Sequence, residues 1–162
     1  DGVLATHKEF MMNRTKFQSK HPEAKELNIP YPFNSGCVKV FNEILKETDA
    51  KIVLSSDWRL YWSLEELDKI FKFNGVIKSP EEITGVSSGK MSWELEKNRV
   101  EEIFQFIEKN KIVDWVAVDD LNLSELGDRF INTRDNEGLK QLSLKDKILK
   151  VLNNESNSTQ NI

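Results

Sequence analysis

Two short apolar runs, each followed by polar residues, constrain the fold of this chain most strongly. Residues 51–55 (Lys-Ile-Val-Leu-Ser) and 113–118 (Val-Asp-Trp-Val-Ala-Val) resemble strands that are buried on both faces of a sheet. Stretches with helical periodicity surround them, at 35–48, 63–73 and 93–109. Because helices that alternate with buried strands favour parallel pairing, we expect an α/β fold: a doubly wound, Rossmann-like parallel sheet with helices on both faces.

Weaker patterns extend this prediction over the rest of the chain. Residues 5–20 are weakly helical, and 21–34 contain three of the four prolines, which favours a loop. Ser63 and Glu66 match a capping box that starts a helix. Further elements are predicted at 75–77 and 129–132 (short strands) and at 144–152 (an amphipathic helix). The polar tail 153–162 has nothing to bury, so we expect disorder there.

Composition limits the class of protein. The 162 residues, 38% hydrophobic and 31% charged, fit one globular domain, which we place at 1–152. A formal net charge of −4 provides no overall attraction for nucleic acid or an anionic membrane. The sequence contains no signal peptide and no run long enough to span a membrane, and Cys37 lies alone in an apolar run. We therefore predict a cytoplasmic protein in which Cys37 is a small buried side chain. The chain starts at Asp1 without a methionine, and we expect the native start to lie upstream.

Asp119 and Asp120 follow the apolar run 113–118 directly. In open α/β sheets, ligands bind beyond the carboxyl ends of the strands. Two adjacent carboxylates at such an edge repel each other, and a divalent cation relieves that repulsion; oxygen ligands of this kind suit magnesium. The alternative is structural: Asp120 caps a turn and Asp119 is merely exposed.

Ser55, Ser56 and Arg59 occupy the corresponding position after the first apolar run. A serine hydroxyl, the free amides of a strand-to-helix turn and a forked guanidinium group together favour binding of a phosphate. The alternative is that Ser56 or Asp57 only caps the following helix, and both roles are compatible.

A cation close to the second polar edge would complete such a site. Lys97 and Arg99 stand near the start of the predicted helix at 93–109, and we favour Arg99 because the apolar periodicity begins there. Most helical lysines and arginines are simply solvated. Asp1 and Gly2 add a carboxylate before a glycine, which suits a tight turn at the end of a strand.

Together these segments resemble the haloacid dehalogenase (HAD) superfamily, which is recognised by four dispersed motifs. Asp1-Gly2-Val3-Leu4 matches the second half of the first motif, and Ser55 at the end of a hydrophobic strand matches the second. Arg99 matches the third motif, and the pair Asp119-Asp120 matches the fourth. A narrower likeness, from Ser55–Arg59, Arg99-x-Glu101-Glu102-Ile103 and Glu137-Gly138-Leu139, is to the HAD domains of RNA-repair multidomain proteins.

The resemblance implies a magnesium-dependent phosphatase that works through an aspartyl-phosphate. The nucleophilic aspartate would lie two residues before Asp1, on a first strand that is missing from the chain, and Asp1 would act as general acid and base. Ser55 would bind the phosphoryl oxygens and Arg99 would offset their charge. The metal ligands implied are Asp1, Asp119 and Asp120, and the substrate-binding candidates are Gly2, Ser56, Arg59 and Lys97.

The substrate is less constrained by the sequence. Residues 5–34 are the candidate for a small cap insertion. Aromatic residues near the phosphate site are able to stack on a base, but such residues are more often part of an ordinary core. We expect a phosphorylated small molecule or a nucleic-acid end as partner. Two alternatives stay open. One is an inactive HAD-like module that binds phosphate. The other is a receiver-like phosphoacceptor domain, but there the acidic pair follows the first strand, whereas Asp119-Asp120 falls late in this chain, which argues against it. The oligomeric state is not predicted.

Overall fold

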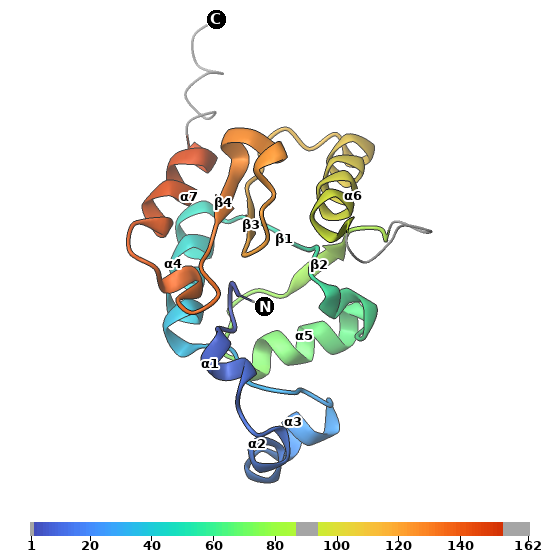
Figure 1. Cartoon of the computed structure of the whole chain (residues 1–162), viewed down its shortest axis with the longest axis vertical. Helices are drawn as coiled ribbons and strands as arrows, with labels where there is room; N and C mark the ends of the chain where they lie inside the picture. Colours follow the sequence, from blue (N-terminus) through green and yellow to red (C-terminus); the bar gives the residue numbers. More distant parts are fainter. Residues whose placement is uncertain (1, 87–93, 154–162) are drawn as a thin grey trace, which may run out of the picture.

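Two pairs of parallel strands form the centre of the molecule, and the structure, a computed structural model, describes residues 2–86 and 94–153. β1 (Ile52–Leu54) pairs with β2 (Pro80–Ile83), and β3 (Ala117–Asp119) pairs with β4 (Phe130–Asn132) (Figure 1). The parallel pairing agrees with the prediction. The predicted single doubly wound sheet is not confirmed, since the described residues form two two-stranded sheets with a cavity between β1 and β3.

Helices cover both faces of the β3–β4 pair. α4 (Ser35–Thr48) and α7 (Leu144–Asn153) pack on one face, where Ile44 and Ile148 join Ile131 of β4 in one apolar cluster. α6 (Leu95–Asn110) packs on the other face, through Val100 and Ile103. This two-sided cover explains why the strands lack an exposed polar face in the sequence.

Local signals set the ends of the helices. α4 has the predicted bounds, and the side chain of Asn34 caps it by accepting bonds from the amides of Gly36 (3.0 Å) and Cys37 (3.3 Å). α5 (Leu64–Phe73) starts after Ser63, and the predicted capping box with Glu66 is present. These helices begin where the sequence predicts because their caps depend on neighbouring residues only.

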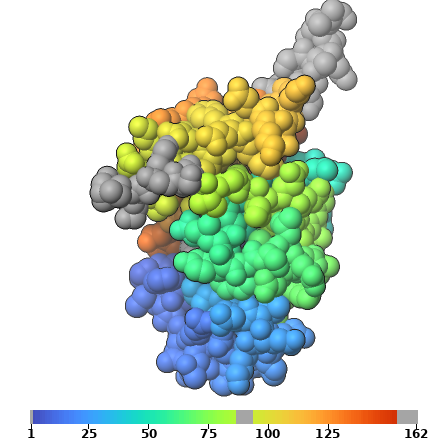
Figure 2. Space-filling model, turned by 90° about the vertical axis from the view of Figure 1, so that its right-hand side faces the viewer, coloured from blue at the N-terminus to red at the C-terminus, as the bar shows by residue number. Residues whose placement is uncertain are grey.

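The segment before α4 forms one end of the molecule (Figures 1 and 2). It contains α1 (His7–Phe10), α2 (Arg14–Lys20) and α3 (Pro22–Glu26). Its buried side chains Phe17 and Ala24 pack with Leu67 and Ile70 of α5. The predicted loop at 21–34 is therefore wrong in part: Pro22 starts α3, since its fixed φ suits the first position of a helix.

Two strand predictions are corrected. Residues 75–77 are not a strand, because Gly75, with a φ of +78°, lies in the turn that ends α5, and the strand is β2 further on. β2 begins with a proline and has exposed Glu81 and Glu82, so it lacks the apolar pattern of a strand. The predicted strand at 113–118 narrows to β3, because Val113 is 75% exposed.

Three further predictions concern single features. Cys37 is fully buried, as predicted, and its thiol lies 3.4 Å from the carbonyl oxygen of Glu137. Asn153 is the last residue of α7, and the rest of the tail lies outside the described residues. Within the described ranges, none of the helices combines the length and apolar character needed to cross a bilayer.

Candidate active site

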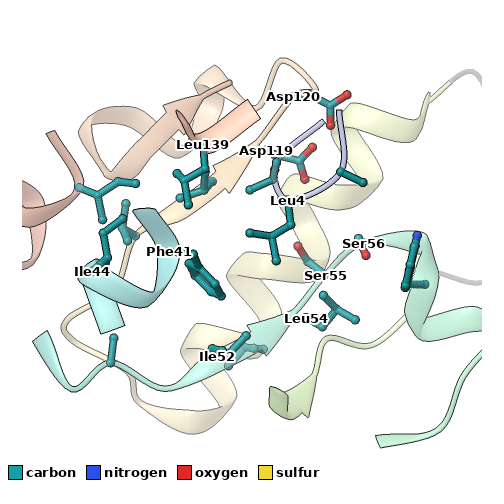
Figure 3. A pocket seen from close by; sticks show the side chains of 18 of the residues that line it. Leu4, Phe41, Ile44, Ile52, Leu54, Ser55, Ser56, Asp119, Asp120 and Leu139 are labelled. Atoms are coloured by element: carbon teal, nitrogen blue, oxygen red, sulfur yellow. The ribbon is translucent and has the colours of Figure 1, made fainter. Parts of the chain in front are cut away.

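A cavity of about 370 Å³ lies between the two sheets, and we call it the central cavity (Figure 3). Its apolar part is formed by side chains such as Phe41, Ile44 and Leu139. Ser55, Ser56, Asp119 and Asp120 gather at its other end (Figure 3). The carboxyl ends of β1 and β3 thus meet at one edge, as the parallel arrangement predicts.

The turn after β1 provides the first part of this edge. Ser55 and Ser56 are half-buried and line the central cavity. Ser56 occupies the cap position of the short 3₁₀ helix Asp57–Leu60, yet its hydroxyl makes no capping bond within the described residues. Ser56 therefore does not act as a side-chain cap. Its hydroxyl is free of that role and lies in the lining of the central cavity, where a ligand can bind it.

The turn after β3 provides the second part. Asp119 is 7% exposed, and its Oδ1 accepts a bond from the amide of Leu121 at 3.0 Å. The first described residues lie against this turn: the Thr133 hydroxyl donates to the carbonyl oxygen of Gly2 at 2.8 Å. A Cβ atom on Gly2, whose φ is +64°, would lie 2.1 Å from Cγ of Asp120. Only glycine fits there, so Gly2 brings the start of the chain beside the acidic pair.

Arg99 connects the two turns. It lies in α6 and is 4% exposed. Its Nη1 is 3.2 Å from Oδ2 of Asp119, and its Nη2 is 2.7 Å from Oδ1 of Asp57. One guanidinium group therefore bridges a carboxylate after β1 to a carboxylate after β3.

The other predicted cations do not line the central cavity, although Nη1 of Arg59 donates to the carbonyl oxygen of Ser55. Arg59 is 8% exposed, and its Nη2 is 2.5 Å from Oε2 of Glu102 in α6. Burial lowers the pKa of Arg59, while Glu102 opposes that shift. Lys97 is exposed. Neither Arg59 nor Lys97 lines the central cavity, so the structure brings together Ser55, Ser56, Arg99 and the acidic pair without them.

The negative charges of Asp119 and Asp120 repel each other, and partial burial adds to the cost of ionising Asp120. Asp120 is exposed as a whole residue, but protein atoms surround part of its carboxyl group. This loss of solvent raises the pKa of Asp120, and repulsion from Asp119 raises it further. Asp57 and Asp119 contact the guanidinium group of Arg99, and Glu102 contacts that of Arg59, so Asp120 adds negative charge in excess of the local cations.

A divalent cation fits this charge distribution. Carboxylate oxygens suit magnesium, and an ion beside Asp119 and Asp120 would relieve their repulsion. No cluster of three or more metal-ligating side chains occurs in 2–86 and 94–153. The third predicted ligand, Asp1, lies outside the described residues, and so does its predicted role as general acid and base.

Three residues that shape the site were not predicted as site residues: Asp57, Glu102 and Thr133. Their partners are remote in the chain, for example Glu102 with Arg59 and Thr133 with Gly2. Asp57 and Glu102 stand in segments that carry the resemblance, and the position of Glu102 between the apolar residues Val100 and Ile103 indicates the buried side of a helix.

Comparison with known families agrees with the geometry. A family described as "HAD domain in Swiss Army Knife RNA repair proteins" matches residues 1–144. The chain therefore belongs to this family of HAD domains, whose fold is α/β and Rossmann-like and whose superfamily consists mainly of phosphohydrolases. A search of the curated proteins and a search of the solved structures each gave no match.

Proposed function

We propose that this domain hydrolyses phosphomonoesters at the edge formed by Ser55, Arg99, Asp119 and Asp120. The observation that carries the proposal is the bridge that Arg99 makes from Asp57 to Asp119. It fixes a buried cation between the two turns that follow β1 and β3, where a transferred phosphoryl group needs its negative charge offset.

Each side chain has a role in this proposal. Ser55, with Ser56 beside it, donates hydrogen bonds to the phosphoryl oxygens, and Arg99 balances their charge in the transition state. Asp119, Asp120 and Asp1 would hold magnesium, which when bound would supply positive charge between the carboxylates and the phosphate. We leave Arg59 and Lys97 out of the phosphate site, because neither lines the central cavity.

The covalent step uses a carboxylate two positions before Asp1, as the first motif of the family requires. That carboxylate attacks phosphorus, and the bond from phosphorus to the ester oxygen breaks. Asp1 gives the departing oxygen its proton and later takes one from the water that hydrolyses the aspartyl-phosphate. Gly2 assists because its left-handed backbone keeps the start of the chain against Asp120.

We further propose that the substrate is the phosphorylated end of a nucleic acid. A polar pocket next to Asp120 is also lined by His7, Arg134, Asp135 and Asn136, and the side chains of His7 and Arg134 suit further phosphate oxygens. On α1, Phe10 is 58% exposed and could stack on a base. The family description also names RNA repair. In this proposal residues 5–34 act as a small cap, and a cytoplasmic location stays a prediction.

Phosphate release tests the proposed function. The protein, including the residues that precede Asp1, is assayed with an aryl phosphate and with 3′- and 5′-phosphorylated oligonucleotides, with and without magnesium. Removal of magnesium or the substitution Asp119→Asn is expected to reduce release by at least about a hundredfold. Asp128→Asn is the matched control, since Asp128 is exposed and lines none of the cavities described.

The outcomes separate the alternatives. Release that persists in Asp119→Asn contradicts the assignment of the site. Magnesium-dependent binding of the oligonucleotides without release of phosphate supports an inactive binding module instead. Release from the aryl phosphate alone supports a phosphatase but contradicts the nucleic-acid substrate.

A further inference from the structure

Four charged side chains beside the candidate site form a closed ring, which we call the charge ring. Oε2 of Glu102 lies 2.5 Å from Nη2 of Arg59 and 3.9 Å from Nε of Arg99. Oδ1 of Asp57 closes the ring, because it lies 2.7 Å from Nη2 of Arg99 and 3.9 Å from Nη1 of Arg59. Two cations and two anions therefore alternate, and the ring is neutral as a whole.

We propose that Arg59 and Glu102 are positioning residues of the proposed phosphate site, and that they set the places of Ser55 and Arg99 through the charge ring. The inference rests on the proposed function and deepens it. Neither Arg59 nor Glu102 lines the central cavity, so each acts only through a neighbour that does.

Arg59 holds the backbone of Ser55. Ser55 comes directly after the last residue of β1, and Nη1 of Arg59 donates to its carbonyl oxygen. The guanidinium group is a rigid planar fork, so the contact of Nη2 with Glu102 also fixes where Nη1 lies. A shift of Glu102 would therefore move Ser55, whose hydroxyl is proposed to bind the phosphoryl oxygens.

Glu102 also limits the orientation of Arg99. Both residues lie in α6, three positions apart, and both side chains are buried. Nε of Arg99 makes no hydrogen bond within the described residues, so the carboxylates around the guanidinium group set its orientation. A cation that is held in place before the phosphate arrives needs no reorganisation during the reaction.

A purely structural role is the alternative. Buried ion pairs contribute little net stability in comparison with apolar side chains of similar volume, so stability alone does not account for four charges here. Two contacts outside the ring favour positioning instead: Arg59 reaches the Ser55 carbonyl, and Arg99 reaches Asp119. Both contacts lead to the carboxyl ends of the strands, where the phosphate site is proposed.

Kinetics in the Ser55→Ala background separate positioning from structure. In the protein that includes the residues before Asp1, Arg59→Lys keeps the charge but loses the fork that holds Glu102 and the Ser55 carbonyl together. We expect kcat for an aryl phosphate to fall about tenfold or more with KM nearly unchanged, because a displaced hydroxyl weakens binding of the transition state. In Ser55→Ala the same change should have little further effect on kcat.

Glu102→Gln is the second variant. It removes the charge but keeps the shape of the side chain, and we expect a similar loss of kcat, because Arg59 and Arg99 lose the anion that they share. Glu108→Gln makes the same change at an exposed position of α6 and should leave kcat unchanged.

Arg129→Lys is the matched control for Arg59→Lys. Arg129 also contacts a carbonyl oxygen and a carboxylate, those of Trp115 (2.9 Å) and Asp114 (3.6 Å). These contacts lie before β3, at the end remote from the site, so kcat should stay unchanged in Arg129→Lys.

Two kinetic results would overturn the proposal. One is an unchanged kcat in Arg59→Lys or in Glu102→Gln. The other is a loss of kcat in Arg59→Lys that is equally large in the Ser55→Ala background, as a structural role predicts.

A failure of the proposed function is recognised separately. If the unmutated protein releases no phosphate, the proposed function fails, and binding of inorganic phosphate, measured by calorimetry, then decides the inference. Arg59→Lys should weaken this binding about fivefold or more, and only where Ser55 is present. Equal weakening in Ser55→Ala, or no binding of phosphate to the unmutated protein, would overturn the inference as well.

Discussion

At the scale of single residues, the buried charges of α6 organise the site. Arg99 faces the two turns, and Glu102, one helical turn further along, pairs with Arg59. The Arg59–Glu102 and Arg99–Asp119 pairs are largely removed from water, so removal of either partner leaves a buried charge. Glu102 is thus a residue that positions the guanidinium groups, while Arg99 is the cation proposed to face the phosphoryl group.

We expect Arg59→Met to lower the free energy of unfolding by about 3–5 kcal/mol, because it leaves the Glu102 carboxylate buried without Arg59. The double variant Arg59→Met with Glu102→Leu should recover most of that loss, since it removes both charges. Urea unfolding of the two single variants and the double variant measures the coupling. If Arg59→Met lowers the free energy of unfolding by less than about 1 kcal/mol, the Arg59–Glu102 pair is exposed to solvent and the described burial is contradicted.

Glu9 gives a prediction about pH. Burial raises the pKa of Glu9, but hydrogen bonds from Thr6 and Asn34 outweigh it and hold the pKa below the ordinary value of 4.5. A lowered pKa in the folded state stabilises the protein fully above 4.5, and this contribution disappears as the pH falls through the folded value. Glu9→Gln should therefore cost about 1 kcal/mol at neutral pH and progressively less in acid. Urea unfolding from pH 7 down to pH 3 measures it, and a constant difference would contradict the assignment.

At the scale of elements, the short 3₁₀ helix Gly138–Lys140 secures the start of the chain. Gly138 has a φ of +61°, and a Cβ atom there would lie 2.6 Å from the carbonyl oxygen of Val3 and 2.8 Å from Sγ of Cys37. We expect Gly138→Ala to lower the free energy of unfolding by about 2–4 kcal/mol, through backbone strain and overpacking.

Gly75→Ala is the matched control. Gly75 also has a positive φ, but open space surrounds its Cβ position, so only strain of about 1 kcal/mol is expected. Thermal unfolding of the two variants separates the effects. Equal losses would show that Gly138 does not pack against Val3 as described.

The helices were predictable because their signals are local. Asn34 before α4 and the box of Ser63 and Glu66 before α5 specify their starts within a few residues. β2 was not predictable, because Pro80 and exposed glutamates carry no apolar pattern and only pairing with β1 makes this segment a strand.

The site, like the fold, was predictable only in part. Ser55, Asp119 and Asp120 follow apolar runs, so the sequence alone indicated that they meet at one edge of a parallel arrangement. The contacts of Arg99 with Asp57 and of Arg59 with Glu102 join residues more than forty positions apart. No local pattern encodes such pairs, because they depend on how α6 packs across the sheets.

At the scale of the whole molecule, the candidate site lies at one end of the central cavity between the two sheets. The fold holds Asp119 and Asp120 together at the proposed magnesium site. Because magnesium would bind this site in the folded protein but not in the unfolded chain, it should stabilise the folded state. At a hundredfold excess over the dissociation constant, we expect a gain of about 2.7 kcal/mol. Thermal unfolding in magnesium and in a chelator measures this gain, which Asp119→Asn should remove. The same gain in Asp119→Asn would place the ion elsewhere.

In the proposed function this domain transfers a phosphoryl group to an aspartate, and trapping of that intermediate is the most direct test. The protein with the residues that precede Asp1 is mixed with a radiolabelled phosphomonoester and magnesium, then quenched in acid. We predict a label on the residue two positions before Asp1, released by hydroxylamine and absent in Asp119→Asn. Phosphate release with no label on that residue, or with a label elsewhere, would contradict the account.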